Sequence, residues 1–146
     1  MADFFSSFRI SGSGLTAQRA RLNAISSNIA NVNTTRTPEG GPYRKKSVVF
    51  EAQGDARNFG EILSAMDPKR HLDRVQVSDI IEDTKPLMKY EPNHPDANEE
   101  GYVAYPNINL VEEMTNMIQA TRAYEANVSA LQAAKDMALA ALEIGR

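Results

Sequence analysis

The sequence predicts an α+β protein in which two long terminal helices pair as a coiled coil, with a small β-rich insert between them. Three observations support this prediction. Apolar residues recur with heptad spacing near both ends of the 146-residue chain. Short segments rich in Val, Ile, Tyr and Phe occupy the middle. All seven prolines lie between Pro38 and Pro106, so the signals that break regular structure are confined to this middle part.

The N-terminal helix follows from residues that recur in alternating steps of four and three between Phe4 and Val32. Such residues form one narrow stripe along a helix. The stretch Ser11–Gly14 weakens it, because each glycine costs about 1 kcal/mol in a helix interior. The helix therefore starts either at Ser13, as its N-cap, or upstream at Asp3. We expect the longer form in an assembly and the shorter one in the free protein. The stripe consists of Phe4, Phe8, Ser11, Leu15, Gln18, Leu22, Ile25, Ile29 and Val32.

The stretch Ser26–Thr35, SSNIANVNTT, is expected to end this helix. Asn and Ser compete for backbone hydrogen bonds and favour helix ends, and Asn tolerates the left-handed conformation of a C-terminal cap. Residues 31–35 should therefore begin the turn into the insert. Asn28 and Asn31 could be plain capping residues, or their amides could bind neighbouring backbones and so fix register. The residues alone leave both interpretations open.

The insert, residues 36–106, contains four segments with strand character, at 43–52, 73–83, 85–92 and 101–108. The polar residues 91–101 form a long loop joining the last two strands. Residues 54–70 have weak periodicity and predict either a short helical turn or a mobile, variable loop. The basic run Arg44–Lys46 is better explained as a solvated strand edge protected by charge than as a site for an anionic surface.

The C-terminal helix is predicted from Ile108–Ile144, which contains no Pro or Gly and is rich in Ala, Glu, Met and Leu. Asn107 or Asn109 can cap its start, and Glu112 and Glu113 favour the first turns. About 35 residues make a rod of roughly 50 Å. The predicted stripe consists of Leu110, Met114, Met117, Thr121, Tyr124, Val128, Leu131, Ala138 and Leu142, with Lys135 as a polar exception.

These two stripes are too long to be covered by so small an insert. The C-terminal stripe must pack on the N-terminal helix, and any surplus must pack on another molecule. The nine alanines between Ala120 and Ala141 allow helices to approach closely. The main inference from the pattern is that the termini form a helix pair suited to lateral assembly.

Composition excludes several classes of function. A net charge of −3 argues against nucleic-acid binding. The absence of cysteine excludes disulfides and thiolate chemistry. No apolar run reaches the ~18 residues of a membrane span, and the first residues lack the basic region of a cleaved secretory signal. His71 and His94 stand apart from any metal-binding pattern, and no catalytic constellation is present. We therefore expect no enzyme activity, cofactor or metal.

Several stretches together resemble one known family. They are Leu15–Gln18 with Leu22, the motif carried by Ser27, Asn28, Ala30, Asn31 and Thr34, and the closing residues 113–146. They are similar to the bacterial flagellar rod, hook and filament-cap family of axial proteins. Residues 42–52 and 94–114, the final ALEIGR and the short length narrow the resemblance to the proximal rod proteins of that family.

The resemblance implies an inner coiled-coil layer from residues 1–35 and 107–146, surrounding an export channel, and an outer layer from the insert. Such subunits leave through the flagellar type III export apparatus without signal cleavage. They then assemble with copies of themselves and other rod proteins into the basal-body drive shaft that spans the periplasm. We expect the terminal helices to be disordered before assembly. The residues expected to pack between subunits are Leu15, Leu22, Ile25, Asn28, Ile29, Asn31, Met114, Met117, Tyr124, Val128, Leu131 and Leu142.

One alternative function remains open at this point. A soluble helical adaptor, or an export-chaperone-like binding module, would hold a partner helix in its groove. Such a module would be helical when dilute, whereas a rod subunit would gain helix on association.

Overall fold

The computed structural model describes residues 2–53 and 74–144, so the predicted variable loop 54–70 lies outside the described residues. The chain is α+β, as predicted, with two long helices and two small antiparallel sheets. The elements in chain order are α1 (Ala2–Ala30), β1 (Lys46–Gln53), β2 (Arg74–Glu82), β3 (Leu87–Tyr90), β4 (Tyr102–Tyr105) and α3 (Leu110–Ile144).

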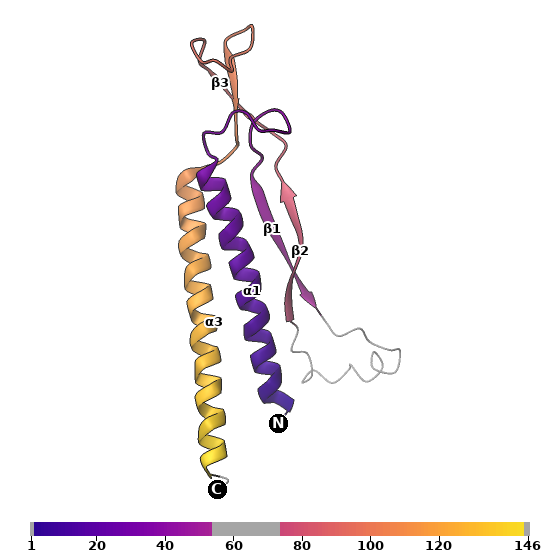
Figure 1. Ribbon diagram of the computed structural model, residues 1–146, viewed down its shortest axis with the longest axis vertical. Coiled ribbons are helices and arrows are strands. Elements are labelled where there is room, and N and C mark those ends of the chain that lie inside the picture. The colour runs from indigo at the N-terminus through magenta and orange to yellow at the C-terminus, as the bar shows by residue number, and fades with distance from the viewer. Residues whose placement is uncertain (1, 54–73, 145–146) are drawn as a thin grey trace, which may run out of the picture.

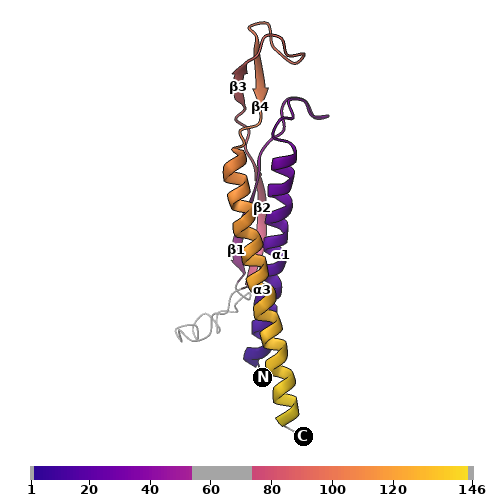
Figure 2. The ribbon, with the colours of Figure 1, turned by 90° about the vertical axis from the view of Figure 1, so that its left-hand side faces the viewer.

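The elements form an elongated molecule in which α1 is the middle layer (Figure 1). It packs on α3 along one side and on the β1–β2 hairpin along the other. The β3–β4 hairpin projects beyond the helices at the end where α1 finishes and α3 begins (Figures 1 and 2). Both termini lie at the opposite end, so the two helices run antiparallel.

α1 is the longer of the two helices that the sequence allowed, and it runs without a break through both glycines. Ser13 is not an N-cap: inside the helix its Oγ donates to the Ile10 carbonyl at 2.7 Å and accepts from the Val75 N–H at 3.2 Å. Gly14 lies against α3, since a Cβ there would lie 3.1 Å from Asn127 Nδ2. The close approach of the helices offsets the weak helix propensity of this glycine.

α1 ends at Ala30, as the Asn-rich stretch predicted. The Asn31 backbone N–H and its side-chain Nδ2 both donate to the Ser27 carbonyl, at 3.1 and 2.8 Å. The predicted left-handed cap is wrong, because no non-glycine residue in the described ranges has a positive φ. The Asn28 and Ile29 carbonyls instead accept from the Asn31 and Val32 N–H groups at 3.3 and 3.4 Å, so bonds between residues three apart close the last turn without a left-handed residue.

α3 buries a different stripe from the one that apolar periodicity predicted. Met117, Tyr124, Leu131 and Ala138 are half-buried as expected, but between them the protected positions are each one residue earlier than predicted. Alanine and polar side chains occupy these positions, and Glu113 among them is the largest fully buried side chain of the described residues. The protected residues are Glu113, Ala120, Asn127 and Ala134, whereas Met114, Thr121, Val128 and Lys135 are exposed.

The two hairpins confirm the predicted strands. β1 pairs with β2 with a bulge at Val49/Phe50, and β3 pairs with β4 across the polar loop 91–101. The buried apolar side chains in the described part of the chain are few, and four of the six are alanines. They are Ala17, Ala24, Ile25, Val103, Ala120 and Ala134. This thin core covers little of the apolar surface that the chain carries.

Candidate functional site

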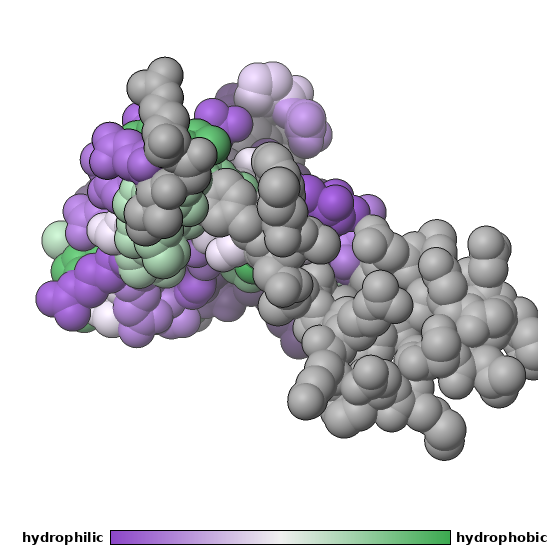
Figure 3. Space-filling view, turned by 90° about the horizontal axis from the view of Figure 1, so that it is seen from below, coloured by the Kyte–Doolittle hydropathy of each residue, from purple (hydrophilic) through white to green (hydrophobic). Residues whose placement is uncertain are grey.

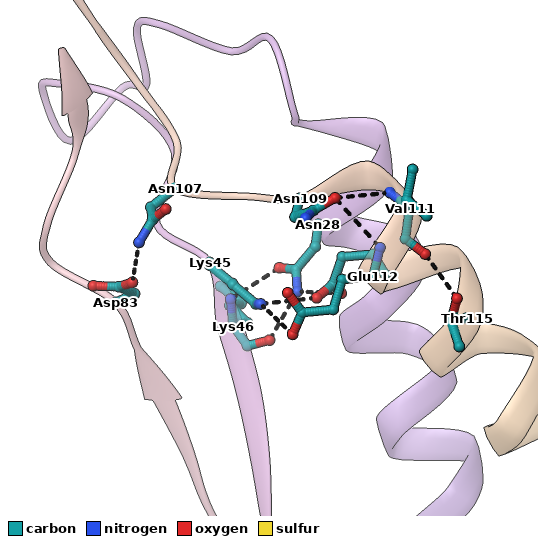
Figure 4. Close-up of polar contacts among 10 residues, drawn as sticks. Asn28, Lys45, Lys46, Asp83, Asn107, Asn109, Val111, Glu112 and Thr115 are labelled. Carbon is teal, nitrogen blue, oxygen red and sulfur yellow. Dashed lines mark hydrogen bonds and ion pairs between the residues drawn. The ribbon is translucent and has the colours of Figure 1, made fainter.

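Where α1 ends, β1 starts and α3 starts, polar groups of the side chains and of the backbone meet (Figure 4). We call this cluster the polar junction and define it as Asn28, Tyr43, Lys45, Lys46 and Glu113. Asn28 and Glu113 are the only buried polar residues among those described, with 1% and 2% of their surface exposed. Buried polar groups must be hydrogen-bonded to be tolerated, so their partners define the geometry of the site.

The Asn28 amide uses its full hydrogen-bonding capacity. Its Nδ2 donates to the Lys46 carbonyl at 2.9 Å and to Glu113 Oε2 at 3.1 Å. Its Oδ1 accepts from the Lys46 N–H at 2.8 Å and from the Tyr43 hydroxyl at 3.2 Å. These partners fix which way the amide points, because the opposite orientation would face oxygen with oxygen.

Glu113 is held by a cation as well as by the amide. Lys45 Nζ lies 3.0 Å from Glu113 Oε1, and the Lys45 side chain is only 20% exposed. Both carboxylate oxygens of Glu113 therefore have a partner. The prediction of a solvated edge for Arg44–Lys46 is wrong for Lys45, and the neighbouring Lys46 and Arg44 face Glu82 at 3.7 and 4.0 Å. Removing one member of a buried pair costs about 3–5 kcal/mol, because the other charge is left uncompensated.

The start of α3 is fixed beside the junction (Figure 4). Asn109 is the N-cap, since its Oδ1 accepts from the Val111 N–H at 3.1 Å. Asn107, the alternative cap, instead donates from Nδ2 to Asp83 Oδ2 at 3.1 Å. The Lys85 backbone N–H and then the Asn107 amide stabilise the Asp83 carboxylate and lower its pKa. The segment after β2 is thereby tied to the segment before α3.

A second set of contacts connects the turn after α1 to the insert. Ser27 Oγ lies 3.0 Å from the Tyr43 hydroxyl, and the Tyr43 N–H donates to the Thr34 carbonyl at 3.1 Å. Thr35 Oγ1 donates to Asp96 Oδ2, in the β3–β4 loop, at 2.8 Å. The Asn-rich stretch thus contacts both hairpin regions.

The β3–β4 hairpin carries its own polar cluster. Lys89 Nζ lies 2.6 Å from Glu91 Oε1, and the Tyr105 hydroxyl donates to Glu91 Oε2 at 2.9 Å. Lys89 and then Tyr105 lower the pKa of Glu91, whereas the bond to Glu91 raises the pKa of both Lys89 and Tyr105. The cluster is exposed to solvent, so it orients the hairpin more than it stabilises it.

The residues predicted to pack between subunits fall into three groups. Buried within the chain are Ile25 and Asn28; half-buried are Leu15, Leu22, Ile29, Asn31, Met117, Tyr124 and Leu131; exposed are Met114, Val128 and Leu142. The exposed group is free to meet another molecule. The amides of Asn28 and Asn31 form hydrogen bonds within their own chain. Any effect they have on packing between subunits is therefore indirect, through the positions of the elements that they hold.

The junction borders an open pocket of ≈ 280 Å³ between α1, β1 and α3, lined among others by Arg21, Phe50 and Asn116. In the described part of the chain, no three His, Cys, Asp or Glu residues are grouped so that they could hold a metal ion. None of the described helices is long and apolar enough to cross a membrane.

Sequence reasoning missed Tyr43, Lys45 and Glu113. Glu113 was assigned only a favourable place near the positive end of a helix. Its contact with Asn28 joins residues 85 positions apart, and no local pattern signals such a pairing. Glu113 directly precedes Met114, a predicted stripe position. Only a second stripe, shifted by one residue along the helix, would have included it.

Comparisons with known proteins show to which family the chain is related. Residues 8–36 match the family described as "Flagella basal body rod protein", and residues 99–144 match "Flagellar basal body rod FlgEFG protein C-terminal". The flagellar basal-body rod protein FlgC of Borreliella burgdorferi is 44% identical over 146 residues, covering 96% of each chain. FlgC of Bacillus subtilis is 44% identical, covering 97% of this chain and 98% of its own. FlgC of Escherichia coli O6:H1 is 41% identical, with 95% and 96% covered. The chain belongs to the FlgC family of flagellar basal-body rod proteins.

Proposed function

We propose that this chain is a structural, self-assembling subunit of the flagellar proximal rod. Copies pack side by side with one another and with other rod proteins, surround the export channel and transmit torque to the hook. The function is mechanical and involves no catalysis or cofactor. The observation that carries the proposal is the amount of apolar surface that α3 leaves uncovered.

α1 covers one side of α3, and large apolar side chains are exposed over much of the remaining surface of that helix. Each of them has between 39% and 72% of its surface exposed. Seen from the end that holds the termini, hydrophobic residues lie on the outside among hydrophilic ones (Figure 3). These exposed side chains are Leu110, Val111, Met114, Ile118, Val128, Met137, Leu139 and Leu142. Burying such surface contributes about 25 cal/mol per Å², and large exposed apolar patches mark interaction sites.

The polar junction suits a part that carries load. Directional hydrogen bonds from Asn28 connect α1 to β1 and to α3, and the Lys45–Glu113 pair closes the same corner. A twist applied to the insert therefore reaches both helices through groups that have one preferred geometry. An apolar corner would slip more easily, because hydrophobic contacts are not directional.

The helix pair is proposed to act as a coiled coil in the inner layer, with the insert outside it. The terminal helices would be only marginally stable before assembly, and so partly unfolded at equilibrium, since the thin core barely offsets the conformational entropy that ordering them costs. Marginal stability also suits passage through the narrow type III export apparatus, without a cleaved signal. The predicted packing residues, including Met114, Val128 and Leu142, would then contact neighbouring subunits.

The test is to express the chain in a bacterium whose own copy has been deleted and to determine a map of its isolated basal bodies. The proposal requires density for α1 and α3 in the rod and restored swimming. A chain that is absent from basal bodies contradicts it. Circular dichroism addresses the adaptor alternative: an adaptor is highly helical when dilute, whereas a rod subunit gains helical signal on association.

A further inference from the structure

The two helices carry opposite charges that do not meet within the chain. Between Ser6 and Ala30, α1 has three arginines and no acidic residue, whereas Leu110–Glu143 of α3 has five acidic and two basic residues. Across the described residues, the arginines of α1 form no ion pair, and neither do Glu125 and Asp136 of α3. Charge complementarity is therefore available for a contact between copies.

The unpaired charges lie on the exposed faces of both helices. Glu125 and Asp136 are eleven residues apart, about three turns, so they share one face of α3 with Ile118. On α1, Arg9 and Arg19 are exposed, and no large apolar side chain is exposed there in the described part of the helix. The other exposed residues on that side of α1 are short or small: Thr16, Asn23, Ser26 and Ala30. The exposed face of α3 therefore carries acids and large apolar groups, and the exposed face of α1 carries arginines and small residues.

The axial spacing of these charges also matches. Within the chain, Gly14 lies opposite Asn127, and Asn28 lies opposite Glu113. Counting along both helices from these contacts, Arg19 is level with Arg122, three residues before Glu125. Arg9 is level with Gln132, four residues before Asp136. At a rise of about 1.5 Å per residue, a single shift of about 5 Å aligns both arginines with both acids.

We propose that the exposed face of α1 in one copy binds the outer face of α3 in a second copy of this chain. The two copies point the same way, and the copy that supplies α3 is displaced about 5 Å toward the hairpin end. Arg19 then faces the second copy's Glu125, and Arg9 faces its Asp136. With the same shift, Ile118 packs over Ser26 and Met114 over Ala30, so large side chains meet small ones.

The contact joins two different faces, so it is heterologous, and each new copy again offers a free α1 or α3. Contacts of this kind build rings when the rotation closes and open helices when it does not. An axial step at each contact prevents closure, so the result is a helix. This inference rests on the proposed function, because it names which faces of neighbouring subunits meet.

Cysteine cross-linking tests the contact, because the chain has no cysteine of its own. Arg19→Cys in an untagged chain and Glu125→Cys in a tagged chain are co-expressed in the deletion strain, and isolated basal bodies are oxidised. The mixed dimer, identified by its size, should dominate. The control pairs Arg19→Cys with Glu112→Cys, an exposed acid on another side of α3, and should give background only. Equal yields from both pairs overturn the inference.

Charge reversal gives a second measurement. Arg19→Glu and Glu125→Arg should each shrink the swimming halo, and the two combined in one chain should restore most of it. Glu99→Arg, in the hairpin loop, is the control and should swim normally. If the single reversals swim like the parent, the inference is wrong while the rod assignment stands. If the parent chain itself never enters basal bodies, the proposed function is wrong.

Discussion

Asn28 binds the backbone of Lys46 as one strand binds another: its Oδ1 accepts the N–H at 2.8 Å and its Nδ2 donates to the carbonyl at 2.9 Å. A side chain of the helix thereby pairs with the first residue of β1. The same amide also reaches Glu113 of α3 at 3.1 Å. One residue therefore sets the relative positions of three elements.

Replacing Asn28 by Asp should destabilise the chain by about 3 kcal/mol or more, because a carboxylate there faces the Glu113 carboxylate and the Lys46 carbonyl without a donor. The shape of the side chain is unchanged, so lost packing does not contribute. Urea unfolding of the full chain measures the effect. Asn23→Asp, on the exposed side of α1, is the control and should stay within about 0.5 kcal/mol. Equal losses in the two variants would show that the junction is not special.

Two glycines in α1 should respond differently to alanine. Gly12→Ala should stabilise by about 1 kcal/mol, because nothing lies within 4 Å of the new methyl group. Gly14→Ala should not give this stabilisation, because its Cβ would lie 3.1 Å from the Asn127 amide. Unfolding midpoints of both variants report the difference. In an Asn127→Ala background, Gly14→Ala should regain the benefit; a gain without this second change would contradict the close helix contact.

Gly101→Ala should loosen the β3–β4 hairpin. Gly101 has a φ of +82°, and an added Cβ would lie 2.8 Å from Tyr90 Cε2. Gly40→Ala is the matched control, since its φ is +92° and the space around it is open. The control should lose only the roughly 1–2 kcal/mol that the backbone conformation costs. Amide exchange in Leu87–Tyr90 should therefore rise in Gly101→Ala only; unchanged exchange there would refute the clash.

The hairpin should also respond to acid. Because the folded pKa of Glu91 is lowered by Lys89 and Tyr105, its contribution to stability is fully present above the ordinary value of 4.5. The contribution is lost as pH falls through the lower, folded pKa. The NMR signals of the Tyr105 ring should shift in this acid range, and Glu91→Gln should abolish the shift. Glu99→Gln is the control and should leave the shift in place. If the Tyr105 signals still shift in Glu91→Gln, the Glu91 carboxylate is not the source of the shift.

Val128→Asp and Leu131→Asp should both prevent rod assembly and swimming while expression continues. They should differ before assembly, because Val128 is 39% exposed whereas Leu131 is half-buried against α1. Val128→Asp should leave the urea midpoint of the isolated chain nearly unchanged, and Leu131→Asp should lower it. Gln119→Asp, also exposed on α3, is the control. Normal swimming in either variant would count against helix packing as the basis of assembly.

Local chemistry was readable from the sequence, and long-range packing was not. The cap of α3 and the end of α1 depend on groups within four residues of one another. Residue type and order therefore predicted the end of α1 and narrowed the cap to Asn107 or Asn109. The strands followed from β-branched and aromatic residues between turns. The observed stripe of α3 differs from the predicted one by one residue at alternate positions. The spacing of large apolar residues, such as Met114 and Val128, shows where apolar surface lies but not which element or molecule covers it.

The candidate site shows the same division. Asn28 was identified through its motif, but its partners lie up to 85 residues away and include a lysine and a glutamate. From sequence alone, charged residues such as these are expected at the surface. Only the structure shows that they are paired and buried. Arg122 and Glu125 are three residues apart on α3, a spacing at which an ion pair can form. No such pair is among those of the described residues, so Glu125 is available to a neighbour.

Thiol labelling of α3 tests the central claim most directly, namely that the uncovered side of this helix is covered by neighbouring subunits. Ile118→Cys, at a position now 56% exposed, is labelled in the isolated chain and in purified basal bodies, with Thr84→Cys as an exposed reference. We predict that position 118 reacts readily in the isolated chain and at least tenfold more slowly in the basal body, while position 84 reacts in both. Equal reactivity of position 118 in the two states would contradict the account.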